Sequence, residues 1–135
     1  MEKINILLLL TPKTELACLS EEMSVRQAIE KMKVHSYTCT PVISKKGEYL
    51  GSITEGDLLW SLVDNDSDIE ETEHINIMEI IRKDYIKAVK VDASMDELIP
   101  IITEQNYVPV IDDRNILMGI VTRRKVIQAL FKSGE

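Results

Sequence analysis

The sequence is poor in the side chains that hold metal ions or carry out nucleophilic catalysis, with two histidines and two cysteines among 135 residues. His35 and His74 stand in no recognisable motif, and Cys18 and Cys39 form no CxxC pair. Neither metal-ligand spacing nor a nucleophile with its base is found in the chain. These absences disfavour an enzyme or a metalloprotein, and two such cysteines indicate buried thiols in a reducing compartment.

Positive charge and long apolar runs are scarce as well. Lysine and arginine total 16 against 23 aspartate and glutamate, a net charge of −7, whereas nucleic-acid binding needs clustered basic charge. The apolar run at residues 4–10 (INILLLL) is shorter than the roughly 20 residues that span a bilayer. It also lacks a strong basic flank and the cleavage site of a signal peptide. We therefore expect a cytoplasmic protein that binds neither nucleic acid nor membrane, with this run packed on the core.

The chain repeats itself. Pro41 and Pro109 each lie inside a short apolar run, and the offset between them also carries Gly51 onto Gly119, Ile53 onto Val121 and Thr54 onto Thr122. Ser24 and Ser94 each precede apolar residues at helical spacing, at an offset that is slightly longer. The two offsets agree if the second copy is two residues shorter after its helix. We therefore predict two repeats, residues 1–65 and 77–135, joined by a solvated acidic linker at 66–76.

Each repeat predicts the order strand, helix, strand, strand, helix, which makes the protein an α+β fold. Ser24 and Ser94 are N-caps of the first helix in each copy. A closing helix begins near Thr54 in one copy and near Thr122 in the other. The strands predicted between these helices are 41–43 and 49–53 in the first copy, and 108–111 and 116–121 in the second.

The closing helices have broader apolar faces than one small sheet can cover. We therefore expect them to pack on the other repeat or on another subunit as well, and a homodimer is the predicted assembly. The candidate dimer contacts are Leu58, Leu62, Val126 and Leu130.

The segment most informative about function is residues 51–57 (GSITEGD), where a strand ends and a helix begins. Amides in the first turn of a helix lack internal partners and lie at the positive end of its dipole, so they attract phosphate. Thr54 can cap that turn and donate its hydroxyl to a phosphate. Asp57, one turn later, can accept both hydroxyls of a ribose. The alternative is a Thr/Asp capping box without a ligand.

These features resemble the CBS domain family, whose repeats end in a glycine, a hydrophobic residue, a threonine and an aspartate three positions later, after a Pro-Val strand. The resemblance covers nearly the whole chain and occurs twice, and residues 11–15 (TPKTE) are similar to the segment that opens such a domain. It implies two repeats packed about a pseudo-twofold axis, with nucleotides in clefts between their sheets. By this resemblance Thr54 touches phosphate or ribose and Asp57 holds the ribose diol. The groups flanking the base would come from Thr14, Leu16, Ala17, Tyr37, Thr38 and Thr40.

The second copy departs from the family pattern, because it reads GIVTRRK, with Lys125 at the position of the aspartate. The ribose acceptor is missing there, and three cations follow Thr122. Arg123, Arg124 and Lys125 could hold a polyphosphate or the far phosphate of a cyclic dinucleotide. Alternatively they form a solvated basic first turn, although cations at that end oppose the helix dipole.

The sequence therefore predicts a regulatory module that senses an adenine nucleotide (AMP, ADP or ATP) in the cleft between two CBS repeats. It would signal to an unidentified effector protein, with no cofactor and no catalysis. A receptor for a cyclic dinucleotide such as cyclic di-AMP is the alternative among binding functions. A ligand-free dimerisation scaffold is the alternative from another class, and a small enzyme ranks third because a nucleophile and its base are missing.

Overall fold

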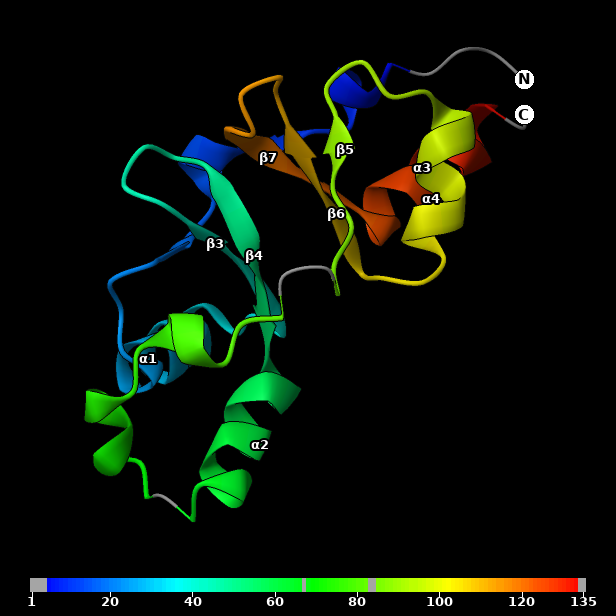
Figure 1. Ribbon diagram of the computed structural model, residues 1–135. Coiled ribbons are helices and arrows are strands. Elements are labelled where there is room, and N and C mark those ends of the chain that lie inside the picture. Colours follow the sequence, from blue (N-terminus) through cyan, green and yellow to red (C-terminus); the bar gives the residue numbers. More distant parts are fainter. Residues whose placement is uncertain (1–4, 67, 83–84, 134–135) are drawn as a thin grey trace. The chain divides into compact units, whose positions relative to one another are not determined.

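The computed structural model describes residues 5–66, 68–82 and 85–133, and the chain divides into two compact units. The first-repeat unit is Ala17–Tyr85, and the second-repeat unit combines Met1–Leu16 with Ile86–Glu135 (Figure 1). Among the described residues each unit holds one small sheet and two α-helices, which confirms the predicted α+β fold.

The first-repeat unit follows the predicted order: β2 (Leu19–Ser20), α1 (Val25–His35), β3 (Cys39–Ile43), β4 (Tyr49–Thr54) and α2 (Glu55–Asp64). β3 is the middle strand, parallel to β2 and antiparallel to β4. Ser24 caps α1 in a complete capping box with Gln27. The buried face of α1 packs on Val42 and Ile53 of the sheet, and this cluster forms the core of the unit.

The second-repeat unit has the same order: β5 (Val89–Lys90), α3 (Met95–Ile102), β6 (Tyr107–Ile111), β7 (Leu117–Thr122) and α4 (Arg123–Ser133). The strand β1 (Thr11–Pro12) is added at the free side of β7, so the sheet order is β1-β7-β6-β5. Both units have a bulge at the equivalent place, between Val42 and Ile43 and between Val110 and Ile111. The repeat seen in the sequence is therefore also present in the structure.

The segments that open the two repeats also match each other. Asn5 and Asn76 each cap a short 3-10 helix, η1 (Ile6–Leu8) and η4 (Ile77–Glu79). In both, the asparagine side chain accepts a hydrogen bond from the amide two residues on. The apolar run at residues 4–10 thus contains a helical turn, whose Ile6 is buried in the core of the second-repeat unit.

Each opening segment joins the sheet of the other repeat. Thr11 pairs with Ile120 of β7, and Figure 1 shows the blue N-terminal segment beside that strand. Arg82, at the equivalent place in the second opening segment, pairs with Ser52 of β4. The two sequence repeats therefore exchange their opening segments, and the compact units do not coincide with residues 1–65 and 77–135.

The linker between the repeats is more structured than its acidic composition predicts. Residues Glu71–His74 form a 3-10 helix, η3, in which Thr72 is fully buried and donates its hydroxyl hydrogen to the carbonyl of Ile69. Arg26 of α1 forms an ion pair with Glu73 at 2.8 Å. The linker is thus anchored on α1 through η3, while Glu71, Glu73 and His74 remain exposed to solvent.

The closing helices α2 and α4 expose a different apolar stripe from the one proposed for dimer contacts. Leu58 and Val126 lie inside the cores of their own units, so they are not available to a second subunit. Leu62 and Leu130 are half-buried. The large apolar side chains that these helices expose are Leu59, Trp60, Val63, Ile127 and Phe131. No helix in the described part of the chain is long and apolar enough to cross a membrane.

Candidate functional site

Thr54 and Asp57 lie together at the junction of β4 and α2. The Thr54 amide donates to Asp57 Oδ2 at 2.8 Å, and the Asp57 amide donates to the Thr54 hydroxyl at 3.1 Å. This is the capping box that the sequence offered as the ligand-free alternative. It engages one oxygen of the carboxylate and leaves Asp57 Oδ1 for another partner.

That partner is Arg82, which sequence reasoning missed. Its guanidinium lies 2.7 Å from Asp57 Oδ1 and 3.7 Å from the centre of the Tyr85 ring. The backbone bridge between Arg82 and Ser52 sets this position, because Ser52 lies near the end of β4, where Asp57 begins the following helix. The Asp57 side chain is 7% exposed and the Arg82 side chain 48%. Asp57 is therefore a nearly buried carboxylate covered by a cation at the surface of the unit.

The first amide of each closing helix is also occupied. The Glu55 amide donates to the Thr38 carbonyl at 2.9 Å, and the Arg123 amide donates to the Asn106 carbonyl at 2.9 Å. Thr38 and Asn106 are equivalent positions of the two repeats. Of the three amides in the first turn of α2, those of Glu55 and Asp57 thus have partners within the chain, so the helix amides alone make a weaker phosphate site than the sequence predicted.

The two faces of the β3–β4 hairpin separate the predicted site residues. Thr40 pairs with Ile53, a core residue, and is 1% exposed, so its side chain faces the helices and a ligand cannot reach it. The prediction that Thr40 flanks a base is therefore contradicted. Cys39 pairs with Thr54 on the opposite face, which makes Cys39 the β3 residue beside the candidate site. Both cysteines are half-buried, less than the buried thiols expected.

Tyr49 and Ser52 form a buried polar pair on the Thr54 face of the sheet. Their hydroxyl oxygens lie 2.7 Å apart. Burial raises the pKa of Tyr49 to about 12, because the phenolate would lose its hydration, and the hydrogen bond to Ser52 opposes that shift. The protonated phenol and the Ser52 hydroxyl therefore form a buried hydrogen bond in the strand that ends at Thr54.

Tyr37 and Ala17 complete the predicted residues of the first-repeat unit. Tyr37 packs against the core and stacks on His35 with ring centroids 5.3 Å apart, so it is a half-buried packing residue. Thr38 is exposed and contributes its carbonyl to the α2 amide. Ala17 is half-buried at the start of the unit.

In the second-repeat unit, Thr122 and Lys125 take the places of Thr54 and Asp57. The Lys125 amide donates to the Thr122 hydroxyl at 3.2 Å, and Lys125 Nζ donates to the Thr11 hydroxyl at 2.9 Å. Thr11 occupies the position in this unit that Arg82 occupies in the other. The two sites are thus built alike, but the first pairs an anion with a cation and the second pairs a cation with a neutral hydroxyl.

The two arginines after Thr122 have different roles. Arg123 Nε donates to the Ile102 carbonyl at 2.9 Å, and its guanidinium also donates to the Thr103 carbonyl at 3.4 Å. Arg123 therefore caps the C-terminal end of α3. Arg124 is exposed, and its side chain forms no hydrogen bond or ion pair with the described residues. Arg124 is therefore the arginine that remains available to a phosphate.

Thr14 and Leu16 belong to the second-repeat unit. Thr14 lies in the 3-10 helix η2 (Lys13–Glu15), which contacts β7. The predicted base-flanking residues thus divide, with Thr14 and Leu16 beside the second copy of the motif and Ala17, Tyr37 and Thr38 in the unit of the first copy. This division of the predicted residues between the two units could have been found in the sequence from the match between the two opening segments, which begin at Asn5 and Asn76.

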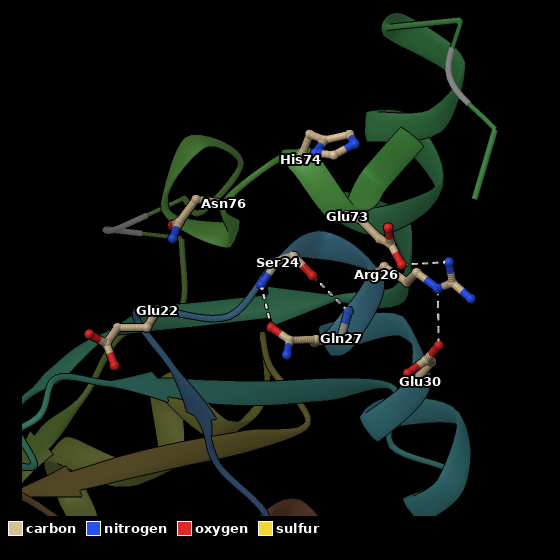
Figure 2. Close-up of a pocket in the computed structure, with 8 residues that line it drawn as sticks. All are labelled: Glu22, Ser24, Arg26, Gln27, Glu30, Glu73, His74 and Asn76. Carbon is tan, nitrogen blue, oxygen red and sulfur yellow. Dashed lines mark hydrogen bonds and ion pairs between the residues drawn. The ribbon is translucent and has the colours of Figure 1, made fainter. Parts of the chain in front are cut away.

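A polar pocket of about 520 Å³ lies near the start of α1 (Figure 2). Figure 2 shows Arg26 between Glu30 and Glu73, and its nitrogens lie 3.1 and 2.8 Å from their carboxylates. Ser24 and Gln27 close their capping box at its centre. These polar groups satisfy one another, which is typical of a surface ion network. In the described residues no group of three or more His, Cys, Asp or Glu side chains could hold a metal ion.

Comparison with known families finds the CBS domain twice, at residues 9–64 and 77–132. An uncharacterised protein of Methanopyrus kandleri is 27% identical over 100 residues, which cover 73% of this chain and 49% of that protein. A homoserine O-acetyltransferase of Methanocorpusculum labreanum is 30% identical over 104 residues, 77% of this chain but 20% of the enzyme. The chain thus spans half or less of these curated relatives.

Solved structures share the fold at lower identity. CbpB in complex with c-di-AMP superposes with a TM-score of 0.87 at 21% identity, covering 96% of this chain and 85% of that one. A CBS domain protein from Streptococcus pneumoniae TIGR4 gives 0.88 at 23% identity, covering 95% and 87%. CBSX2 in complex with AMP gives 0.76 at 22% identity, covering 94% and 96%.

Proposed function

The chain belongs to the CBS domain family, and from that premise we propose that it is a regulatory module that binds an adenine nucleotide and reports it to a partner protein. The observation that carries the proposal is Asp57, a nearly buried carboxylate held at a helix N-terminus with a guanidinium beside it. A nucleotide offers a ribose diol to the carboxylate and a phosphate to the cation. The AMP complex of CBSX2 supports this class of ligand.

The closing helix α2 is the route by which occupancy reaches a partner. Asp57 lies in its first turn, and Leu59, Trp60 and Val63 are exposed farther along it. A ligand shifts a conformational equilibrium only if it binds two states with different affinity. Because the ligand would replace contacts that now hold the start of α2, it can favour a different position of this helix, and the exposed side chains would present that change to an effector protein.

Cyclic di-AMP is the second candidate ligand. It is supported by the complex of CbpB, a structural neighbour of the chain, and by the cations at the start of α4. Arg124 is exposed and Lys125 holds only a neutral hydroxyl, so both can turn to a second phosphate. A mononucleotide needs one such site, whereas a cyclic dinucleotide carries two phosphates that need cations.

A homodimer is the proposed assembly, formed by the exposed apolar side chains of the closing helices. Trp60 is 59% exposed beside Leu59 and Val63, and large aromatic side chains dominate the energy of protein interfaces. Trp60→Glu should therefore convert a dimer to the 15.4 kDa monomer in light scattering. Val34→Glu, which introduces the same residue at an exposed apolar position of α1, outside the closing helices, serves as control. A wild-type protein that is monomeric at high concentration contradicts the assembly.

Titration calorimetry with AMP, ADP, ATP, cyclic di-AMP and GTP tests the function. We expect micromolar binding of at least one adenine ligand and no release of product. Asp57→Asn keeps an acceptor for the Thr54 amide but removes the charge, and it should weaken AMP binding roughly tenfold or more, since a hydrogen bond to a charged group is worth about 1.5–3 kcal/mol. Asp64→Asn, at the far end of α2, is the matched control.

Three results would count against the proposal. Absence of heat with every adenine ligand favours the ligand-free dimerisation scaffold. Steady release of product during the titration favours an enzyme. Unchanged AMP affinity of the Asp57→Asn variant means that the ligand lies elsewhere on the chain.

A further inference from the structure

Both carboxylate oxygens of Asp57 already have a partner in the structure. Its Oδ2 accepts from the Thr54 amide and its Oδ1 lies 2.7 Å from the Arg82 guanidinium. Only 7% of its side chain is exposed. A ribose diol needs free access to the carboxylate, so it cannot bind Asp57 while Arg82 keeps this position.

Arg82 can leave that position without unfolding the unit. Its side chain is 48% exposed, and besides Asp57 it contacts the face of the Tyr85 ring at 3.7 Å. Its backbone is held separately, by the bridge to Ser52. The guanidinium can therefore move away from Asp57 while the main chain of Arg82 stays beside β4.

The cost of that movement depends on what the ligand offers in return. A nucleoside offers the carboxylate two neutral hydroxyl groups and gives the displaced guanidinium no anion. A nucleotide offers the same hydroxyls and a phosphate, which a guanidinium binds with two parallel hydrogen bonds. Only the phosphorylated ligand replaces the charge partner that Arg82 loses.

We propose that Arg82 is the residue that makes the Asp57 site select phosphorylated ligands over nucleosides, by exchanging the Asp57 carboxylate for the phosphate of the ligand. The inference rests on the proposed function and adds a selectivity to it. The second-repeat unit has no equivalent device among its described residues, because Thr11 stands at the position of Arg82 and Lys125 at that of Asp57. The selection therefore operates at one of the two copies of the motif.

Titration of AMP and adenosine, which differ only by the phosphate, into the wild type and into Arg82→Ala tests the proposal. In the variant, adenosine should bind more tightly, AMP more weakly, and the AMP-to-adenosine affinity ratio should fall about tenfold or more. Arg82→Lys keeps the charge and should retain most of the ratio. Arg114→Ala, another exposed arginine paired with an aspartate, should leave the ratio unchanged.

A merely structural role for Arg82 changes the affinity of both ligands by the same factor. An unchanged ratio in Arg82→Ala, with a wild type that binds AMP, therefore overturns this inference and leaves the proposed function in place. Absence of AMP and adenosine binding to the wild type and the variant overturns this inference, whereas the proposed function falls only if ADP, ATP and cyclic di-AMP fail to bind as well. Melting curves of the variants exclude unfolding as the cause of a lost signal.

Discussion

Substituting Gly119 tests whether β1 is required for the second-repeat unit. Gly119 lies in β7 opposite Pro12 of β1. A methyl group at its Cα would lie well inside van der Waals contact with the carbonyl oxygen of Thr11 and 2.9 Å from Cδ1 of Leu10. The Leu10 side chain can turn aside, but the Thr11 carbonyl belongs to the backbone of β1, so the whole strand would have to move.

Overpacking of this kind costs about 1–3 kcal/mol and occasionally more, and a backbone clash belongs at the upper end. For a unit of this size each kcal/mol lowers Tm by about 4–8 °C. At about 3 kcal/mol, Gly119→Ala should therefore lower Tm by roughly 12–24 °C. Hydrogen exchange should become faster at residues 9–16, which contain β1, and should stay unchanged at 17–66.

Gly56→Ala is the matched control, because the same substitution at that position should leave Tm unchanged or raise it. A methyl group on Gly56 would lie 3.6 Å from the Thr54 hydroxyl and 4.0 Å from Trp60, which are ordinary contacts. Alanine is favoured over glycine in a helix by up to about 1 kcal/mol, so Tm should be equal or higher. The reasoning is refuted if Gly119→Ala melts like the wild type, or if both variants lose the same stability.

The buried phenol and the two arginines of α4 give further tests. Burial raises the pKa of Tyr49 to about 12 from 10.0. Between these pH values the folded state keeps a proton that the unfolded state releases, so the free energy of unfolding should fall as pH rises from 10 to 12. Urea titrations should show a loss of about 2–3 kcal/mol relative to Tyr49→Phe. Equal losses in both proteins would contradict this assignment. Arg123→Ala should cost about 1–2 kcal/mol in thermal melting because the carbonyls at the end of α3 lose their donor, whereas Arg124→Ala should cost under about 0.5 kcal/mol. Arg124→Ala should instead weaken cyclic di-AMP more than AMP in calorimetry, and an equal effect on both ligands would exclude a role in binding the second phosphate.

The repeat and the pair Thr54/Asp57 could be predicted because both depend on local patterns. A serine or threonine N-cap with its partner three residues later, and a proline in a short apolar strand, are visible in any single segment. The same patterns recur in the second half of the chain at a nearly constant offset. The order of elements and the start of each closing helix follow from these signals.

The partners of the site residues could not be predicted because they come from distant segments. Arg82 stands in no motif, and it reaches Asp57 only because its backbone bridges to Ser52, in a strand that comes much earlier in the chain. The family resemblance implied that Thr40 flanks the base, but one position along a strand changes the face, and Thr40 faces the core. Strands of two residues, such as β1, carry no periodicity from which a partner could be read.

The exchange of opening segments has a consequence for the order in which the chain folds. The first-repeat unit is continuous from Ala17 to Tyr85, so it can fold while the chain is still being synthesised. The pairing of Thr11 with Ile120 instead joins segments near opposite ends of the chain, and contacts of such long range are slow to form. Residues 5–16 thus precede the first-repeat unit in synthesis but reach their place only after β7 has been made, and the core that buries Ile6 and Leu9 is incomplete until then.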